Sequence, residues 1–167
     1  MTTELIVAKE SEKETLKNLY SLYLHDLSLY SEGLQPNENG LFEFDAFHLI
    51  WEKEGIHPYL IKVDGHLAGF FLLLSAPLMT KVDYCINDFF LLNQYRGQGI
   101  GEQALDLLFE THQGNYFVEQ LKSNERAVQY WKKIFKRYGF SYEEKLEVKD
   151  GEECVGQFFQ VSLATSK

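Results

Sequence analysis

The stretch Asp88–Glu110, with the sequence DFFLLNQYRGQGIGEQALDLLFE, decides the fold. Its first apolar run, 89–92, is short and aromatic and predicts a buried strand. A polar turn and the glycine loop 96–101 follow, and then a helix is predicted over 98–112. The apolar residues of this helix recur at amphipathic spacing, at Ile100, Ala104, Leu107 and Leu108. Strand, glycine loop and helix N-terminus together favour phosphate binding, because the first helical N–H groups have no partner inside the helix.

The glycine spacing can be compared with known phosphate-binding patterns. The Walker pattern GxxxxGK[ST] does not occur in the chain. Gly99–Ala104 matches the looser dinucleotide pattern GxGxxA, and Glu119 follows about twenty residues later, where a ribose-binding acid is expected. A dinucleotide-binding fold needs several strand–helix–strand repeats, however, and the sequence predicts only one, over 82–121. A loop without a ligand is disfavoured, because its closely spaced glycines cost chain entropy and weaken the start of the helix.

The pattern R-x-x-G-x-G at Arg96–Gly101 resembles the acetyl-CoA loop of the GNAT superfamily of N-acetyltransferases, although Asn93 replaces the usual proline. The resemblance implies acetyl-CoA as co-substrate, loop amides that hold its pyrophosphate, and no metal. The preceding strand would present main-chain groups to the pantetheine arm and to the developing oxyanion. The implied cofactor contacts are Phe90, Leu91, Leu92, Arg96, Gly97, Gln98, Gly99, Ile100, Gly101 and Glu102.

A second stretch, Ser123–Ala127, resembles the signature in which the family places an asparagine at a helix start near the pantetheine arm. Asn124 is predicted to cap this helix, and the resemblance implies that it also contacts CoA. Trp131 occupies the position of the family's usual general acid, a tyrosine, and an indole offers no acid chemistry. We therefore expect Trp131 to pack against the cofactor arm, and we expect Tyr130 to be turned about 100° away.

Glu119 lies where some family members have a general-base glutamate. An amine arrives as an ammonium ion and must lose a proton before it attacks. A partly buried carboxylate with a raised pKa suits that task, and the neighbours of Glu119 are apolar. A solvent-facing strand glutamate is the alternative. Asp88, at the head of the central strand, is the second candidate for the base.

The predicted fold is a single domain over residues 1–167, of the α/β (α+β) class. It has a GNAT-like mixed, mostly antiparallel sheet of about seven strands, flanked by about four helices. Strands are predicted at 5–7, 59–63, 66–74, 82–92, 116–121, 140–148 and 155–163. Helices are predicted at 11–29, 42–54, 98–112 and 124–136.

The composition limits the partners. The 167 residues carry 16 basic and 25 acidic side chains, a net charge of −9 that argues against nucleic-acid binding. This charge is compatible with a cationic amine substrate, although acidity for solubility explains it equally well. No apolar run reaches membrane-spanning length and no signal pattern begins the chain, so we expect no membrane partner and a cytoplasmic location. The sequence is also compatible with a homodimer.

The resemblance implies an N-acetyltransferase in which a primary amine of a small molecule or peptide attacks the thioester directly. A non-catalytic acyl-CoA-binding or sensing module is the alternative, because the usual tyrosine is missing. A dinucleotide-binding protein is the third interpretation.

Overall fold

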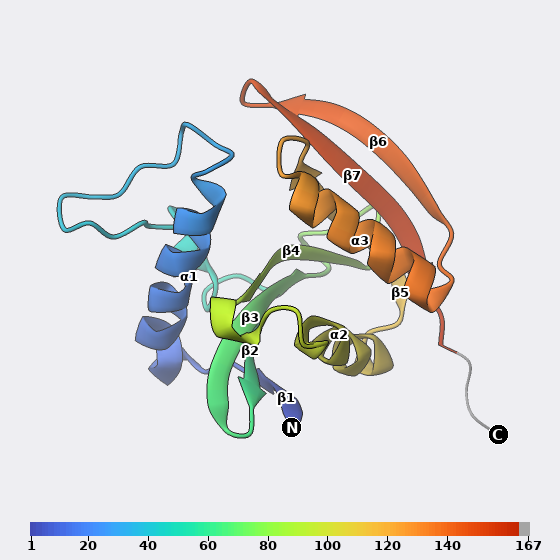
Figure 1. Ribbon diagram of the computed structural model, residues 1–167, viewed down its shortest axis with the longest axis horizontal. Helices are drawn as coiled ribbons and strands as arrows, with labels where there is room; N and C mark the ends of the chain where they lie inside the picture. Colours follow the sequence, from blue (N-terminus) through green and yellow to red (C-terminus); the bar gives the residue numbers. More distant parts are fainter. Residues whose placement is uncertain (164–167) are drawn as a thin grey trace.

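The computed structural model describes residues 1–163, which form one seven-stranded sheet in the order β1-β2-β3-β4-β5-β7-β6 (Figure 1). All strand pairs are antiparallel except β4 with β5. The strands are β1 (Thr3–Val7), β2 (Ile56–Val63), β3 (His66–Leu74), β4 (Tyr84–Leu91), β5 (Gly114–Leu121), β6 (Tyr142–Lys149) and β7 (Glu152–Val161). The helices are α1 (Lys13–Leu27), α2 (Ile100–Thr111) and α3 (Glu125–Tyr138). The predicted fold class is confirmed, and a single parallel pair excludes a dinucleotide-binding sheet.

The helices cover both faces of the sheet. α2 and α3 pack on one face, where Ile100, Leu105 and Ile134 join the main core. α1 packs on the other face, where Leu16 and Tyr20 join a second core. The run FFLLL in β3 explains this arrangement, since successive residues point to opposite faces and all but the last are buried. No helix within residues 1–163 is long and apolar enough to cross a membrane.

The two central strands separate soon after they meet. β4 and β5 pair only at Tyr84–Tyr116 and Cys85–Phe117, although both strands continue beyond these pairs. The register between β3 and β4 shifts just after this point, which leaves Asn87 as an extra residue in β4. Such a bulge bends a strand and increases its twist. The bend accompanies the divergence of β4 from β5, so part of each strand has an open edge toward the other.

The predicted helix over 42–54 is wrong, and residues 1–163 contain three α-helices instead of four. This segment consists of turns and a short 3₁₀ helix at Phe47–Leu49. Its aromatic side chains, Phe44 and Trp51 among them, pack on the second core as the helical spacing suggested. Turns bury the same residues, and the Asn37 side chain holds the preceding loop by accepting two main-chain N–H bonds. Within the segment itself, three-residue turn bonds such as Phe47 N–H to Phe44 O replace the helical pattern.

Candidate active site

The glycine loop between β4 and α2 has an open inner side. Gly97 and Gly99 adopt φ values of +74° and +78°, which glycine reaches without strain. A Cβ at either position would meet nothing within 4 Å. Gly99 is also the N-cap of α2, so no side chain caps the first N–H groups of this helix. These groups and the positive end of the helix dipole are therefore available to an anion.

Gly101 has a different role from the other two glycines. It is buried in the first turn of α2, and a Cβ there would lie 2.5 Å from Tyr130 Oη and 3.2 Å from Phe89 Cζ. Gly101 therefore lets α2 pack directly against β4 and α3.

Tyr130 is the site residue that sequence reasoning missed. Its hydroxyl is buried beside the start of α2 and has no hydrogen-bond partner within residues 1–163. Burial raises the pKa of Tyr130 far above its usual range, so the hydroxyl keeps its proton. Trp131 is 7% exposed and lies among the core aromatics, with its ring centroid 6.4 Å from that of Phe89. The four-residue spacing of Tyr130 and Ile134 on α3 was the signal that could have shown Tyr130 to face inward.

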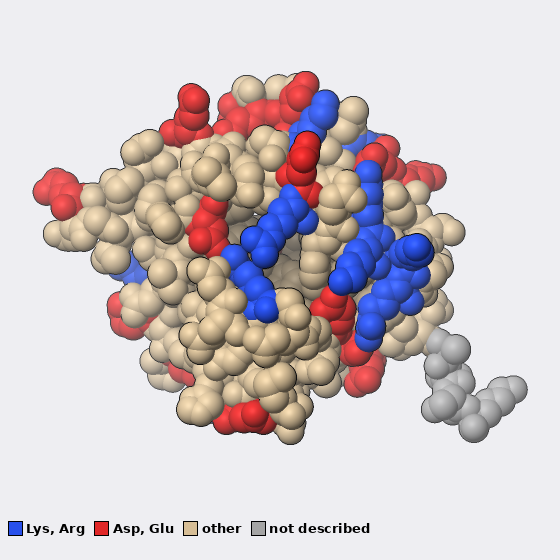
Figure 2. Space-filling view, in the orientation of Figure 1, with Lys and Arg blue, Asp and Glu red and all other residues tan. Residues whose placement is uncertain are grey.

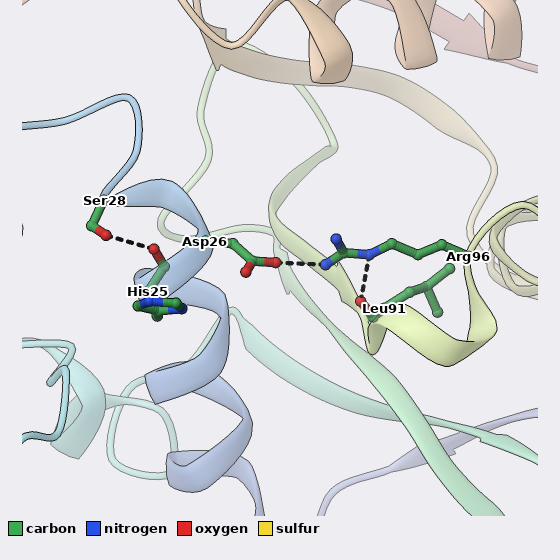
Figure 3. Close-up of polar contacts among 5 residues, drawn as sticks. All are labelled: His25, Asp26, Ser28, Leu91 and Arg96. Atoms are coloured by element: carbon green, nitrogen blue, oxygen red, sulfur yellow. Dashed lines mark hydrogen bonds and ion pairs between the residues drawn. The ribbon is translucent and has the colours of Figure 1, made fainter.

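Arg96 uses its side chain within the protein (Figure 3). Its Nη2 donates to Asp26 Oδ2 over 2.6 Å, and its Nε donates to the carbonyl of Leu91 over 2.9 Å. The guanidinium also lies 5.5 Å from the centre of the Phe90 ring. The Arg96 side chain therefore fixes the loop against α1 and the end of β4.

The open edge of β4 has main-chain groups that point toward β5. Leu92 N–H donates to Ala68 O over 2.8 Å, on the β3 side. Groups of successive residues point to opposite edges, so Phe90 also faces β3, whereas Phe89 and Leu91 face β5. Of the three residues predicted to present main-chain groups, Leu91 thus has its N–H at the gap.

Four further predicted residues occupy the loop and the two helix starts. The Asn124 side chain accepts from Ala127 N–H over 3.2 Å, which confirms its capping role. Gln98 is exposed, and its amide donates to a loop carbonyl. Ile100 is 1% exposed and belongs to the core, so only its main chain is near the open loop. Glu102 is half-buried in the first turn of α2.

The opposite side of the gap, on the α1 face, holds the carboxylates of Asp88 and Glu119. Asp88 Oδ2 accepts hydrogen bonds from Tyr20 Oη over 2.7 Å and from Asn87 Nδ2 over 3.0 Å. Burial raises the pKa of Asp88 in spite of these bonds. Burial, with the nearby charges of Asp88 and Glu119, raises the pKa of the Cys85 thiol to about 12. Cys85 is therefore an uncharged thiol at neutral pH and a poor nucleophile.

Glu119 is neither free nor fully exposed. Its Oε1 lies 2.9 Å from Lys149 Nζ, and 22% of its side chain is exposed. Lys149 reaches it from β6 across β7, where Gly156 lies opposite Glu119 and leaves room. The structure thus places both predicted base candidates, Asp88 and Glu119, on one face of the sheet near Cys85. Within residues 1–163, no group of three or more His, Cys, Asp or Glu side chains could hold a metal ion.

α3 contributes a row of basic side chains beside the loop although the chain as a whole is acidic. Figure 2 shows a hollow in this face, over β4 and beside the loop into α2, with several Lys and Arg side chains and some Asp and Glu side chains at its rim. α3 contributes five basic residues against a single acidic one, at Arg126, Lys132, Lys133, Lys136 and Arg137. A polyanionic ligand is therefore favoured here despite the net charge of −9.

A diverging strand pair with an open glycine loop on one side and carboxylates on the other is compatible with an acyltransferase domain. Residues 16–136 match the sequence profile of the Acetyltransferase (GNAT) family. This match covers more than half of the chain, and the chain belongs to this family of acyltransferase enzymes. No curated protein is significantly similar to it.

Solved structures share the fold at low sequence identity. An acetyltransferase from Thermus thermophilus is 15% identical with a TM-score of 0.68, over 95% of this chain and 96% of that one. The ribosomal-protein-S18-alanine N-acetyltransferase from Escherichia coli is 14% identical with a TM-score of 0.60, over 98% and 97%. A CoA-dependent acyl-homoserine lactone synthase, BjaI, solved with SAM and isopentyl-CoA, is 11% identical with a TM-score of 0.66, over 96% and 84%.

Proposed function

We propose that the chain transfers an acetyl group from acetyl-CoA to a primary amine of a small molecule or peptide. One observation carries the proposal: the gap between β4 and β5 has an open glycine loop on one side and the carboxylates of Asp88 and Glu119 on the other. The former suits a pyrophosphate and the latter suit an ammonium ion. The family and the CoA-dependent synthase of similar fold support an acyl-CoA donor.

The residues at the loop fit a CoA molecule. Gly97 and Gly99 leave the space that a pyrophosphate needs, and the first N–H groups of α2 would hold it. The unpartnered hydroxyl of Tyr130 is a buried donor beside the same helix start. When bound, acetyl-CoA supplies an acyl group that a thioester activates toward amines. A sulfur leaving group needs little help from an acid near neutral pH, which accommodates the core position of Trp131.

The chain's own groups account for the remaining steps. Leu91 N–H, at the open edge of β4, would donate to the acetyl oxygen as negative charge develops on it. Glu119 would take the proton from the ammonium ion, directly or through water, with Lys149 holding the carboxylate in place. Asp88 is the second candidate, and its raised pKa suits a base. The uncharged thiol of Cys85 favours direct attack by the amine over an acyl-enzyme.

A thiol-release assay tests this function. The protein is incubated with acetyl-CoA and a panel of polyamines, amino acids and short peptides with free N-termini, and free CoA is measured. We expect release that depends on the amine and is lost in Gly99→Ala. Acetyl-CoA that raises the melting temperature without release for any amine would favour the sensing module, for which the replacement of the usual tyrosine by Trp131 is the supporting observation.

A further inference from the structure

The outer edge of the sheet at β6 is long, regular and uncovered. β6 is the last strand in the sheet order, and all eight of its residues are exposed. Figure 1 shows β7 on one side of it and, within residues 1–163, no other element on the other side. β6 has no proline, no glycine and no register shift against β7. Proteins usually protect an edge strand with a proline, a bulge or charged side chains, or by keeping the strand short. The opposite edge of this sheet is short, since β1 has five residues.

The side chains of β6 have a pattern that suits pairing with itself. One face of the strand presents alternating charges, at Glu143, Lys145, Glu147 and Lys149. The other face includes Leu146 and Val148, which are 67% and 68% exposed. Strands that only avoid pairing need no alternation of sign, because charges of either sign keep an edge in water. The alternation and the exposed aliphatic residues therefore point to a specific partner strand.

The main-chain groups of β6 also suit such a partner. Asp150 and Gly151 form a two-residue turn with φ values of +52° and +78°, which places Lys149 opposite Glu152. In a hairpin of this kind the pair next to the turn is hydrogen-bonded. The odd-numbered residues of β6 therefore bond to β7, and the even-numbered residues point their N–H and C=O groups outward. Leu146 lies in the middle of this outward-pointing set.

We propose that two copies of this chain pair along β6 in antiparallel fashion, around a two-fold axis at Leu146. Leu146 then lies opposite Leu146 of the second copy. Glu143 lies opposite Lys149, and Lys145 lies opposite Glu147, on both sides of the axis. Among the residues with outward main-chain groups, Leu146 meets Leu146 and Glu144 meets Val148, so the hydrogen bonds of a continuous sheet can form over residues 144–148.

The charges disfavour the two adjacent registers. With the axis at Lys145, that residue would face its own copy, and Glu143 would face Glu147. With the axis at Glu147, that residue would face its own copy, and Lys145 would face Lys149. Like charges directly opposite each other in a sheet are destabilising. Lys149 also contacts Glu119, so this interface would lie next to the candidate base. The proposal is independent of the amine-acetylation proposal, which stands if the dimer fails.

Sedimentation of charge-reversed variants tests the pairing. Lys145→Glu alone sets Glu against Glu147 twice in a homodimer, and Glu147→Lys alone sets Lys against Lys145 twice. We expect the wild-type protein to be a dimer and each single variant to be a monomer at equal concentration. A mixture of the two variants restores opposite charges at every position, so it should form a heterodimer. Lys133→Glu, an exposed reversal on α3, is the matched control and should leave the dimer unchanged.

Circular dichroism checks that each variant is folded. A folded variant that sediments as a monomer has lost the interface and not the fold. A wild-type protein that remains a monomer at about 100 μM, where any micromolar Kd gives dimer, would contradict the proposal and leave the charges a merely protective role. A wild-type dimer that survives both single reversals would place the interface elsewhere. Two monomeric variants that stay monomeric when mixed would also exclude the register around Leu146.

Discussion

Arg96 and Asp26 form an ion pair at 2.6 Å that joins the end of α1 to the glycine loop (Figure 3). Asp26 lies in the last turn of α1, where a carboxylate opposes the helix dipole. The Arg96 guanidinium offsets the charge of the Asp26 carboxylate and the negative end of the α1 dipole. It also donates a hydrogen bond to the Leu91 carbonyl at the end of β4. The pair therefore links the helix on the α1 face with the loop that would hold CoA.

Asp26→Asn should destabilise the protein measurably. The Arg96 and Asp26 side chains are 29% and 38% exposed, so this ion pair is intermediate between a surface pair and a buried pair. We therefore expect a loss of about 1 kcal/mol in the free energy of unfolding. Urea unfolding measures this loss. The control is Glu153→Gln, which breaks the exposed pair with Lys122 and should cost less than about 0.5 kcal/mol. Equal effects of the two variants would show that the Arg96 pair does not hold the loop.

Gly99→Ala should remove acetyl-CoA binding without removing the fold. Gly99 and Gly40 have the same φ of +78°, and a methyl group added at either residue would have no other atom within 4 Å. Alanine should therefore cost each site a similar strain of about 1 kcal/mol. Only at Gly99 would the methyl group enter the anion site. Calorimetric titration with acetyl-CoA compares the two, and equal affinity in both variants would place the pyrophosphate elsewhere.

The structure changes which glycine is informative. Sequence reasoning gives all three loop glycines the same task, but Gly101 lies against Tyr130 and Phe89. A valine at 101 would disturb the core and α2 together, so lost binding could not be assigned to the loop. Local patterns therefore predicted the strand, the loop and the helix, whereas the contacts of each glycine depend on α3, which lies later in the chain.

Glu119→Gln should lower turnover much more than it lowers CoA affinity. The variant keeps size and hydrogen bonding but removes the base, and a positioned base contributes about 10²–10⁴-fold. The fall of kcat/KM at low pH, which the protonation of Glu119 would cause, should also disappear in this variant. The measurement is a pH–rate profile with an amine that the wild-type protein acetylates, and Asp88→Asn is the comparison. If Glu119→Gln keeps full activity while Asp88→Asn loses it, the base is Asp88.

Asp88→Asn should have a pH-dependent effect on stability. Burial raises the pKa of Asp88, so the folded state favours the protonated form. The stability that this group contributes is present below its unfolded pKa and is lost as pH rises through the folded value. Asparagine does not ionise, so the melting temperature of Asp88→Asn relative to wild type should rise as pH increases above about 4. Asp45→Asn, at an exposed position, is the control. A difference independent of pH would contradict the buried-carboxylate account.

Long-range pairs explain what the sequence did not predict. The apolar spacing of α2 and the Asn124 cap act within a few residues, and these features were predicted correctly. Arg96 and Asp26 are 70 residues apart, and Lys149 and Glu119 are 30 apart, so no local pattern indicates either pair. The segment 42–54 shows the opposite failure, since its helical spacing is real but turns bury the same aromatic residues.

The fate of a labelled acetyl group tests the central claim most directly. Acetyl-CoA with an isotopically labelled acetyl group is incubated with the protein and the amine panel, and mass spectrometry follows both amine and intact protein. We predict label on an amine, one free CoA for each acetylated amine, and none on the protein, because the Cys85 thiol stays protonated with its pKa raised to about 12. Label on Cys85 before an amine is added would contradict direct transfer. Acetyl-CoA that binds but transfers no label to any amine would contradict the enzyme.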